Sequence, residues 1–105
     1  MNFRPQRGHL YRMYDSVYGT LFCLTVSDSH AELGDTCIAV RASGSTERRD
    51  FPGWVRFGAG DPVAGYAVVH DLDRVDFDEL KEDLGPVSQD TMHNVNRALK
   101  RLLGL

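Results

Sequence analysis

Cysteine is scarce in this chain, and long apolar runs are missing. The 105 residues include only two cysteines, Cys23 and Cys37, each inside an apolar run and without a Cys-x-x-Cys spacing. Such placement predicts two buried free thiols and no disulfide framework. No apolar run approaches the roughly 18 residues that a membrane span needs, and the polar, basic N-terminal arm has no signal-peptide core after it. We therefore expect a cytoplasmic protein that does not associate with membranes.

The sequence also lacks the short motifs of phosphate-binding loops, dinucleotide-binding folds and zinc proteases. Histidines are present, but they are widely spaced and form no metal-ligand pattern: His9, His30, His70 and His93. We therefore expect neither a metal ion nor another cofactor.

Lysine is absent from the first half of the chain. Residues 1–57 carry seven arginines and six acidic residues, whereas residues 58–105 carry five basic and nine acidic residues. Since the planar guanidinium suits phosphate, we expect any polyanion site in the first half. The length and the 42% hydrophobic content predict one domain over residues 1–105.

Alternation and short apolar runs predict five strands, which lie at residues 9–14, 20–26, 36–42, 54–57 and 65–70. Residues 27–35 are typical of a turn with room for one helical turn at its middle. Asp76 and Glu79 form a capping box that predicts a short helix, which Gly85-Pro86 would end. A longer helix begins at Ser88 and places its apolar residues on one face: Met92, Val95, Leu99, Leu102 and Leu103.

These elements predict a small α+β or barrel-like domain with a terminal helix packed across it. We expect Leu99 and Leu102 to be buried against the sheet or against a second subunit. Trp54 is expected at a strand start, without a catalytic role.

Polar residues follow two of the predicted strands. Arg41 and Ser43 are two residues apart, so alternation aims both side chains to one face, where a cation beside a hydroxyl could hold a phosphodiester. A solvent-facing strand edge explains the same two residues more simply. His70-Asp71 follows the fifth strand, and an imidazole there could serve as general acid or base. A histidine at a strand end is nevertheless more often a plain surface residue.

Short stretches of the chain follow one another in a familiar order. Arg7-Gly8-His9-Leu10-Tyr11 comes first, and the series continues through residues 24–27, 38–43, 51–55, 61–67 and 84–105. Together they resemble the MazF/PemK-type toxins of bacterial type II toxin–antitoxin systems over residues 7–105. The resemblance implies an α+β fold: a small, twisted, partly open β-barrel of the SH3-like, CcdB/PemK-like kind with a C-terminal helix, packed as a homodimer.

The resemblance also implies an activity. Such toxins are metal-independent, sequence-specific endoribonucleases that cleave single-stranded RNA to 2′,3′-cyclic phosphate and 5′-hydroxyl ends, and a cognate antitoxin blocks their groove. The family's basic catalytic residue falls on Leu21 in this chain, and its catalytic threonine falls on Ser43. A downstream acidic position falls on His70 or on Asp71, depending on a one-residue shift.

Leucine cannot stabilise the charge of a phosphorane, so two main hypotheses follow. In the first, the chain is an active endoribonuclease with Arg41, or else Arg12, as the replacement cation, Ser43 orienting the phosphate and His70 transferring a proton. The residues expected to bind the RNA are then Arg12, Tyr14, Tyr18, Arg48 and Arg49. In the second, a catalytically inactive relative binds RNA or an antitoxin. A gyrase-directed poison, as among the CcdB relatives, ranks last.

Overall fold

The computed structural model describes residues 4–28, 31–44 and 52–105. The described residues form six strands, two single-turn 3-10 helices and one α-helix. In chain order they are β1 (His9–Asp15), β2 (Gly19–Thr25), η1 (Ala31–Leu33), β3 (Thr36–Ser43), β4 (Trp54–Arg56), β5 (Tyr66–Asp76), η2 (Phe77–Glu79), β6 (Leu80–Pro86) and α1 (Gln89–Leu103). Among these helices none is long and apolar enough to span a membrane.

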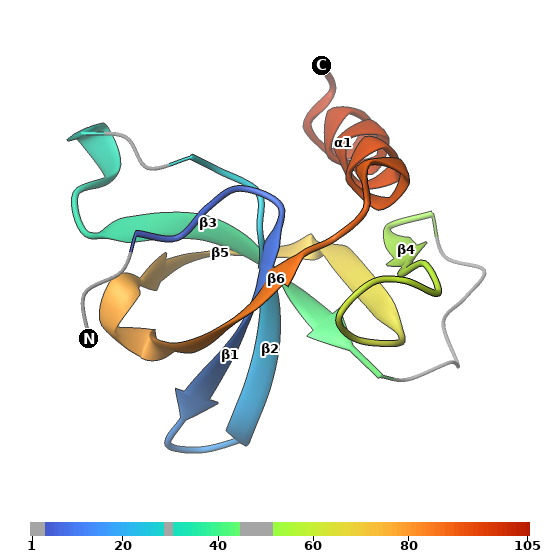
Figure 1. Cartoon of the computed structure of the whole chain (residues 1–105). Helices are drawn as coiled ribbons and strands as arrows, with labels where there is room; N and C mark the ends of the chain where they lie inside the picture. Colours follow the sequence, from blue (N-terminus) through green and yellow to red (C-terminus); the bar gives the residue numbers. More distant parts are fainter. Residues whose placement is uncertain (1–3, 29–30, 45–51) are drawn as a thin grey trace.

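The six strands form one antiparallel sheet in the order β4-β5-β3-β2-β1-β6. The sheet is strongly twisted and curls without closing, and α1 lies across one side of it (Figure 1). This arrangement confirms the predicted α+β class and the partly open barrel with a C-terminal helix. The five predicted strands are all present, with β5 extending to Asp76.

The helix predicted from Asp76 to Gly85-Pro86 is wrong. The capping signal is real, since the Glu79 carboxylate accepts a hydrogen bond from the Asp76 amide at 3.4 Å, but it starts only the single turn η2. The chain then continues as β6, which pairs with β1. A spacing of four residues, as between Leu80 and Leu84, puts two side chains on one face of a helix or of a strand. The exposed backbone edge of β1 decides in favour of the strand, because pairing satisfies its amide and carbonyl groups.

The two faces of the sheet carry separate cores. On the α1 side, the fully buried side chains of Leu10, Leu24 and Val40 pack with Val95 of the helix. The opposite side holds a second cluster of six buried residues: Tyr11, Cys23, Cys37, Ala39, Val75 and Leu80. Both cysteines are therefore buried and free, which confirms the prediction.

Helix α1 begins where the sequence predicts. The Ser88 side chain accepts a hydrogen bond from the Thr91 amide at 3.2 Å and caps the first turn. Val95 is buried and Leu99 is partly buried against the sheet. The sheet does not bury Leu102, which is 48% exposed in the single chain, so of the two predicted alternatives burial against a second subunit stays a prediction. The C-terminal end of α1 extends beyond the sheet (Figure 1), and Leu102, Leu103 and Leu105 are exposed in the single chain.

Candidate active site

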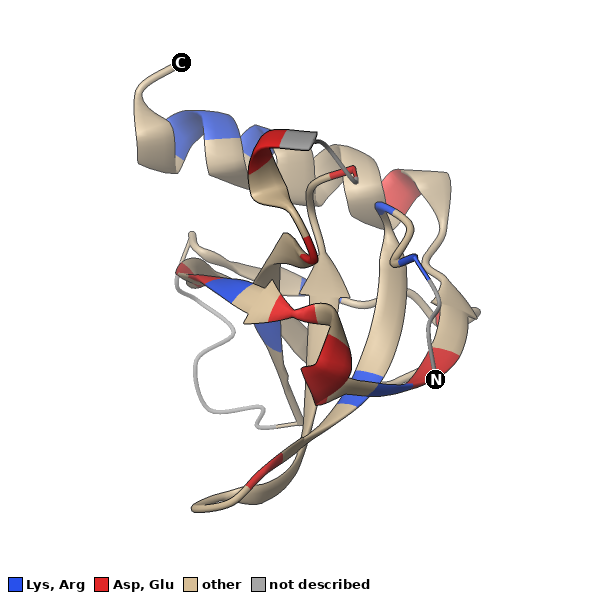
Figure 2. Ribbon diagram, turned by 90° about the vertical axis from the view of Figure 1, so that its left-hand side faces the viewer, with Lys and Arg blue, Asp and Glu red and all other residues tan. Residues whose placement is uncertain are grey.

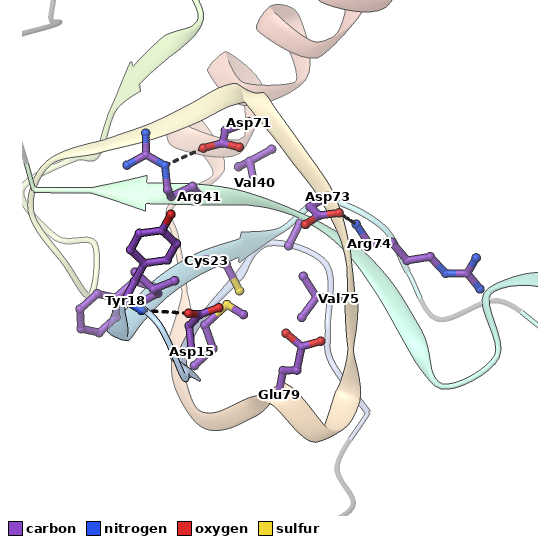
Figure 3. A pocket seen from close by; sticks show the side chains of 14 residues that line it. Asp15, Tyr18, Cys23, Val40, Arg41, Asp71, Asp73, Arg74, Val75 and Glu79 are labelled. Atoms are coloured by element: carbon purple, nitrogen blue, oxygen red, sulfur yellow. Dashed lines mark hydrogen bonds and ion pairs between the residues drawn. The ribbon is translucent and has the colours of Figure 1, made fainter.

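A groove of about 610 Å³ lies on the face of the sheet opposite α1 (Figure 3). Strands β1, β2, β3 and β5 and the turn η2 form its walls. Apolar side chains such as Leu21, Cys23 and Val75 line part of it, and charged side chains line the rest. Burial raises the pKa of the Cys23 thiol to about 12, with smaller contributions from Cys37 and Glu79. The thiol is therefore protonated at neutral pH and is no candidate for a nucleophile.

A bulge in β5 determines which of its residues face the groove. Arg41 of β3 pairs with Val68, but the preceding residue, Val40, pairs with Leu72. Residues 69–71 of β5 are therefore extra residues without partners in β3, and the alternation of side chains resumes in a new phase after them. Beyond the bulge, Asp73 lies opposite Ala39 and lines the groove with it.

The bulge brings an acidic side chain to Arg41. The Nε–H of Arg41 donates to Oδ2 of Asp71 at 2.6 Å, and both residues line the groove (Figure 3). The two side chains are 44% and 51% exposed. An ion pair in such a position contributes about 0 to 1 kcal/mol to stability. Its main consequence is orientation, because a guanidinium held through Nε has its two terminal nitrogens left for a ligand.

Ser43 lies on the same strand face as Arg41. It ends β3, two residues beyond Arg41, and is half-buried opposite Tyr66 of β5. The pairing of β2 with β3 sets Cys23 opposite Arg41, and continuing that register sets Leu21 opposite Ser43. Arg41 is thus the diagonal neighbour of Leu21, and diagonal neighbours in a sheet lie within reach of a long side chain.

His70 lies apart from these residues although it precedes Asp71. Its side chain is exposed and its ring lies against Gly53, where an added Cβ would come within 2.8 Å of the imidazole Nδ1. Among the described residues that line the groove, Asp71 is present and His70 is not.

The residues predicted to contact RNA are divided between several places. Tyr18, 78% exposed at the tip of the β1–β2 hairpin, lines the groove, whereas Tyr14 is exposed but does not line it. The Asp15 carboxylate shapes that tip by accepting hydrogen bonds from two backbone amides, including that of Tyr18 at 2.9 Å. Arg12 is outside the groove lining and forms an ion pair of 3.0 Å with Glu82 of β6. Arg48 and Arg49 lie outside the described residues.

Sequence reasoning missed the acidic character of the groove. Within residues 4–28, 31–44 and 52–105, its lining carries four carboxylates and two guanidiniums: Asp15, Asp71, Asp73, Glu79, Arg41 and Arg74. The Arg74 guanidinium is turned to the Thr36 hydroxyl at 2.8 Å and to the Leu33 carbonyl at 3.3 Å. The available signal was the alternation in Asp71-Leu72-Asp73, which continues the fifth strand with both carboxylates on one face.

The chain matches known proteins along almost its whole length. The profile of a family described as "PemK-like, MazF-like toxin of type II toxin-antitoxin system" matches residues 1–103. Endoribonuclease MazF1 of Mycobacterium bovis and endoribonuclease MazF4 of Mycobacterium tuberculosis are each 39% identical over 101 residues, covering 96% of this chain and 94% of the relative.

Solved structures agree with this match. A mycobacterial endoribonuclease in complex with its cognate antitoxin is 37% identical, with 96% of each chain covered and a TM-score of 0.85. MazF in the MazE–MazF complex of Deinococcus radiodurans, at 21% identity, covers 99% of each chain with a TM-score of 0.84 and shares the fold. On these grounds the chain belongs to the PemK-like, MazF-like toxins of type II toxin–antitoxin systems.

Proposed function

We propose that this chain is the toxin of a type II toxin–antitoxin pair and that it cleaves single-stranded RNA in the groove beside Arg41. Its relatives at 39% identity are named endoribonucleases, which supports this class of activity. The observation that carries the proposal is the position of Arg41. It lies diagonally across from Leu21, on which the resemblance to MazF/PemK-type toxins places the family's basic catalytic residue, and on the strand face that also carries Ser43.

The proposed reaction is the attack of a ribose 2′-oxygen on the adjacent phosphorus. The O2′–P bond forms and the P–O5′ bond breaks, which leaves a 2′,3′-cyclic phosphate and a 5′-hydroxyl. One group must take the proton of the 2′-hydroxyl, and another must deliver a proton to O5′. Because the pentavalent intermediate carries additional negative charge, a positioned cation lowers the barrier.

Arg41 is the proposed cation. Its Nε is held by Asp71, so its terminal nitrogens can fork onto two oxygens of the scissile phosphate. The Ser43 hydroxyl is proposed to orient the same phosphate. Asp71 lines the groove with an Oδ1 atom that has no hydrogen-bond partner among the described residues, so we assign the 2′ proton to it. His70 lies outside the groove lining and is not assigned a role in this step, so the proton for O5′ is proposed to come from water in the open groove.

The role of Arg41 as the catalytic cation can be tested by moving the guanidinium from position 41 to position 21. We expect Arg41→Ala to lower the cleavage rate on the order of 100-fold, the usual effect of losing a positioned charge-stabilising group. Adding Leu21→Arg to that variant should raise the cleavage rate again by at least about tenfold, since it places a guanidinium at the position diagonal to residue 41. The assay maps the ends formed in a mixed RNA pool with EDTA present, and proposed products carry 5′-hydroxyl ends.

The matched control is Arg74→Ala. Arg74 also lines the groove, but its guanidinium is bound to Thr36 and to the Leu33 carbonyl. This variant should cleave as the wild type does. Equal losses in Arg41→Ala and Arg74→Ala would mean that only the net charge of the groove matters, and intact RNA with folded wild-type protein would contradict the enzyme proposal.

A catalytically inactive toxin relative is the second candidate, and the charge of the groove favours it. Among the described lining residues, four carboxylates against two guanidiniums make a poor site for an RNA backbone unless a cation is added elsewhere. In that case the groove would hold the antitoxin, without cleavage of RNA. Capture of the antitoxin by protein that leaves RNA intact would support this candidate.

Partners follow from the same proposal. We propose a cognate antitoxin as the protein partner, in line with the antitoxin complex of the 37% identical relative. We also propose a homodimer, because Leu102, Leu103 and Leu105 are 48%, 55% and 86% exposed in the single chain. Sedimentation at several concentrations tests the dimer, and the variant Leu103→Asp should shift it toward the monomer.

A further inference from the structure

Positively charged side chains are concentrated on α1, whereas the acidic groove lies on the opposite face of the sheet. The C-terminal half of the helix carries Arg97, Lys100 and Arg101, which appear as blue bands in Figure 2, whereas its one acidic residue, Asp90, is in the first turn. Two arginines from elsewhere join these three residues. We call the set of five the α1 basic patch: Arg7, Arg56, Arg97, Lys100 and Arg101.

The patch is organised around Arg97. A hollow of about 450 Å³ on one side of it is lined by Arg7 and Lys100 among others, and a hollow of about 260 Å³ on the other side is lined by Arg56 and Arg101. Arg97 lines both hollows, and no acidic residue of the described chain lines either one. Arg97 therefore lies between the two hollows, each of which carries two further cations.

In the single chain these cations are available to a ligand. The smaller hollow, with Arg56, Arg97 and Arg101, contains none of the leucines proposed for the dimer, whereas Leu103 and Leu105 line the larger one. All five residues are exposed, and within the described part of the chain none of them forms an ion pair. Arg7 is held by a hydrogen bond from its Nε to the Val26 carbonyl at 3.0 Å and by another from its Nη2 to Asn96. Five cations without an ion pair among the described residues, around two hollows that share Arg97 on a protein with a net charge of −3, indicate a binding surface for a polyanion.

We propose that the α1 basic patch binds the phosphodiester backbone of single-stranded RNA outside the groove. The inference rests on the proposed function, which supplies the RNA. Four of the five cations are arginines, whose forked donors match phosphate oxygens, and cations around two hollows that share Arg97 can contact more than one phosphate of a strand. The patch also adds attraction for an RNA backbone, because the described groove lining carries four carboxylates against two guanidiniums.

The test measures binding separately from cleavage. The probe is a fluorescent 30-nucleotide RNA of mixed sequence with 2′-O-methyl riboses, which cannot undergo 2′-hydroxyl attack. We expect Arg97→Glu to weaken its binding about fivefold or more. The slope of log Kd against log salt should fall by about 0.7 for each phosphate that the variant no longer neutralises.

Lys81→Glu is the matched control, because Lys81 is an exposed cation of β6 outside both hollows and its reversal changes the net charge equally. It should bind the probe within about twofold of the wild type. Equal effects of Arg97→Glu and Lys81→Glu, or no effect of Arg97→Glu, would overturn the proposal. Circular dichroism on each variant confirms folding, and Arg101→Glu should reproduce the result of Arg97→Glu.

The failures of the two proposals are distinguishable. Cleavage of a short RNA that fills only the groove should be equal in Arg97→Glu and wild type. If the wild type cleaves RNA but Arg97→Glu binds the long probe normally, the patch proposal alone is overturned. If the probe binds through Arg97 and no RNA is cleaved, the patch stands and the nuclease proposal fails. Displacement of the probe by polyglutamate at equal charge would assign the patch to an acidic protein instead.

Discussion

The Nε–H of Arg41 and Oδ2 of Asp71 are 2.6 Å apart, although 30 residues separate them in the chain. The contact exists because the β5 bulge turns Asp71 toward β3. We expect Asp71→Asn to keep a carbonyl acceptor for Arg41 but to lose the proton acceptor, so that kcat falls while KM changes little. Asp71→Ala removes both functions, so kcat should fall further and KM should rise.

Steady-state kinetics on a defined RNA separate these outcomes. Asp73→Asn is the control, since Asp73 lines the same groove and its Oδ1 accepts a hydrogen bond from the Arg74 amide rather than from Arg41. It should keep the wild-type kcat. If Asp71→Asn and Asp71→Ala behave alike in both kcat and KM, Asp71 does not position Arg41.

Gly65 leaves no space for a side chain beside the proposed site. Its φ is +110°, and an added Cβ would lie 2.1 Å from the carbonyl oxygen of Ser43. Gly65→Ala should lower the free energy of unfolding by about 3 kcal/mol or more, because backbone strain and a backbone clash act together. Urea denaturation measures the change. Gly60→Ala, which has open space around its added Cβ, should cost less than about 1 kcal/mol, and a similar loss in both variants would contradict this account.

Asp61 joins the β4–β5 connection to the start of α1. It accepts hydrogen bonds from the Thr91 hydroxyl at 2.6 Å, the Ser88 amide at 2.7 Å and the Gly58 amide at 2.7 Å. Burial acts to raise the pKa of Asp61, but these hydrogen bonds outweigh burial and lower the pKa below its ordinary value. The carboxylate therefore stabilises the fold above the ordinary pKa of about 4, and this stabilisation is lost as the pH falls through the lowered pKa.

We expect Asp61→Asn to cost about 1 to 2 kcal/mol at pH 7 and progressively less below about pH 4. Urea denaturation at a series of pH values measures both effects. Asp28→Asn, at an exposed aspartate, should change stability by less than about 0.5 kcal/mol. A loss in Asp61→Asn that stays constant from pH 7 to pH 3 would show that the charge plays no part.

The two thiols should be unreactive in the folded protein. Cys23 and Cys37 are 3% and 1% exposed, and burial raises their pKa values to about 12 and about 11. At pH 8 both thiols are protonated and shielded, so native protein should release no nitrothiobenzoate from DTNB. After denaturation in guanidinium chloride, each chain should release two equivalents. Labelling of native protein within minutes would mean that the groove-side core opens readily.

Local patterns predicted most of the fold. Strand alternation located β1 to β4, and Ser88 marked the start of α1, because each signal lies within a few neighbouring residues. The signal failed at Leu80–Pro86, where the spacing of Leu80 and Leu84 suits a helix and a strand equally. Whether this segment forms a helix or a strand depends on the free edge of β1, which lies about 70 residues away in the sequence. The local pattern contains no information about that edge.

The candidate site was predicted only in part. Arg41 and Ser43 could be placed on one strand face, because both belong to one regular strand. The partner of Arg41 could not be foreseen, because it depends on a bulge in another strand. The α1 basic patch was missed for a different reason. Residues 58–105 are acidic in total, and only the fold separates Arg97, Lys100 and Arg101 from the carboxylates of β5 and β6.

The bulge at residues 69–71 gives this fold a way to change its chemistry without changing its architecture. Deleting or inserting a single residue there would leave the strand order intact but would exchange inward and outward side chains along the rest of β5. Two proteins that differ by one such event would superpose closely and yet present different functional groups at the same point. Alignments of distant relatives across this segment therefore need a gap chosen by strand pairing, because residue similarity alone would equate His70 with Asp71.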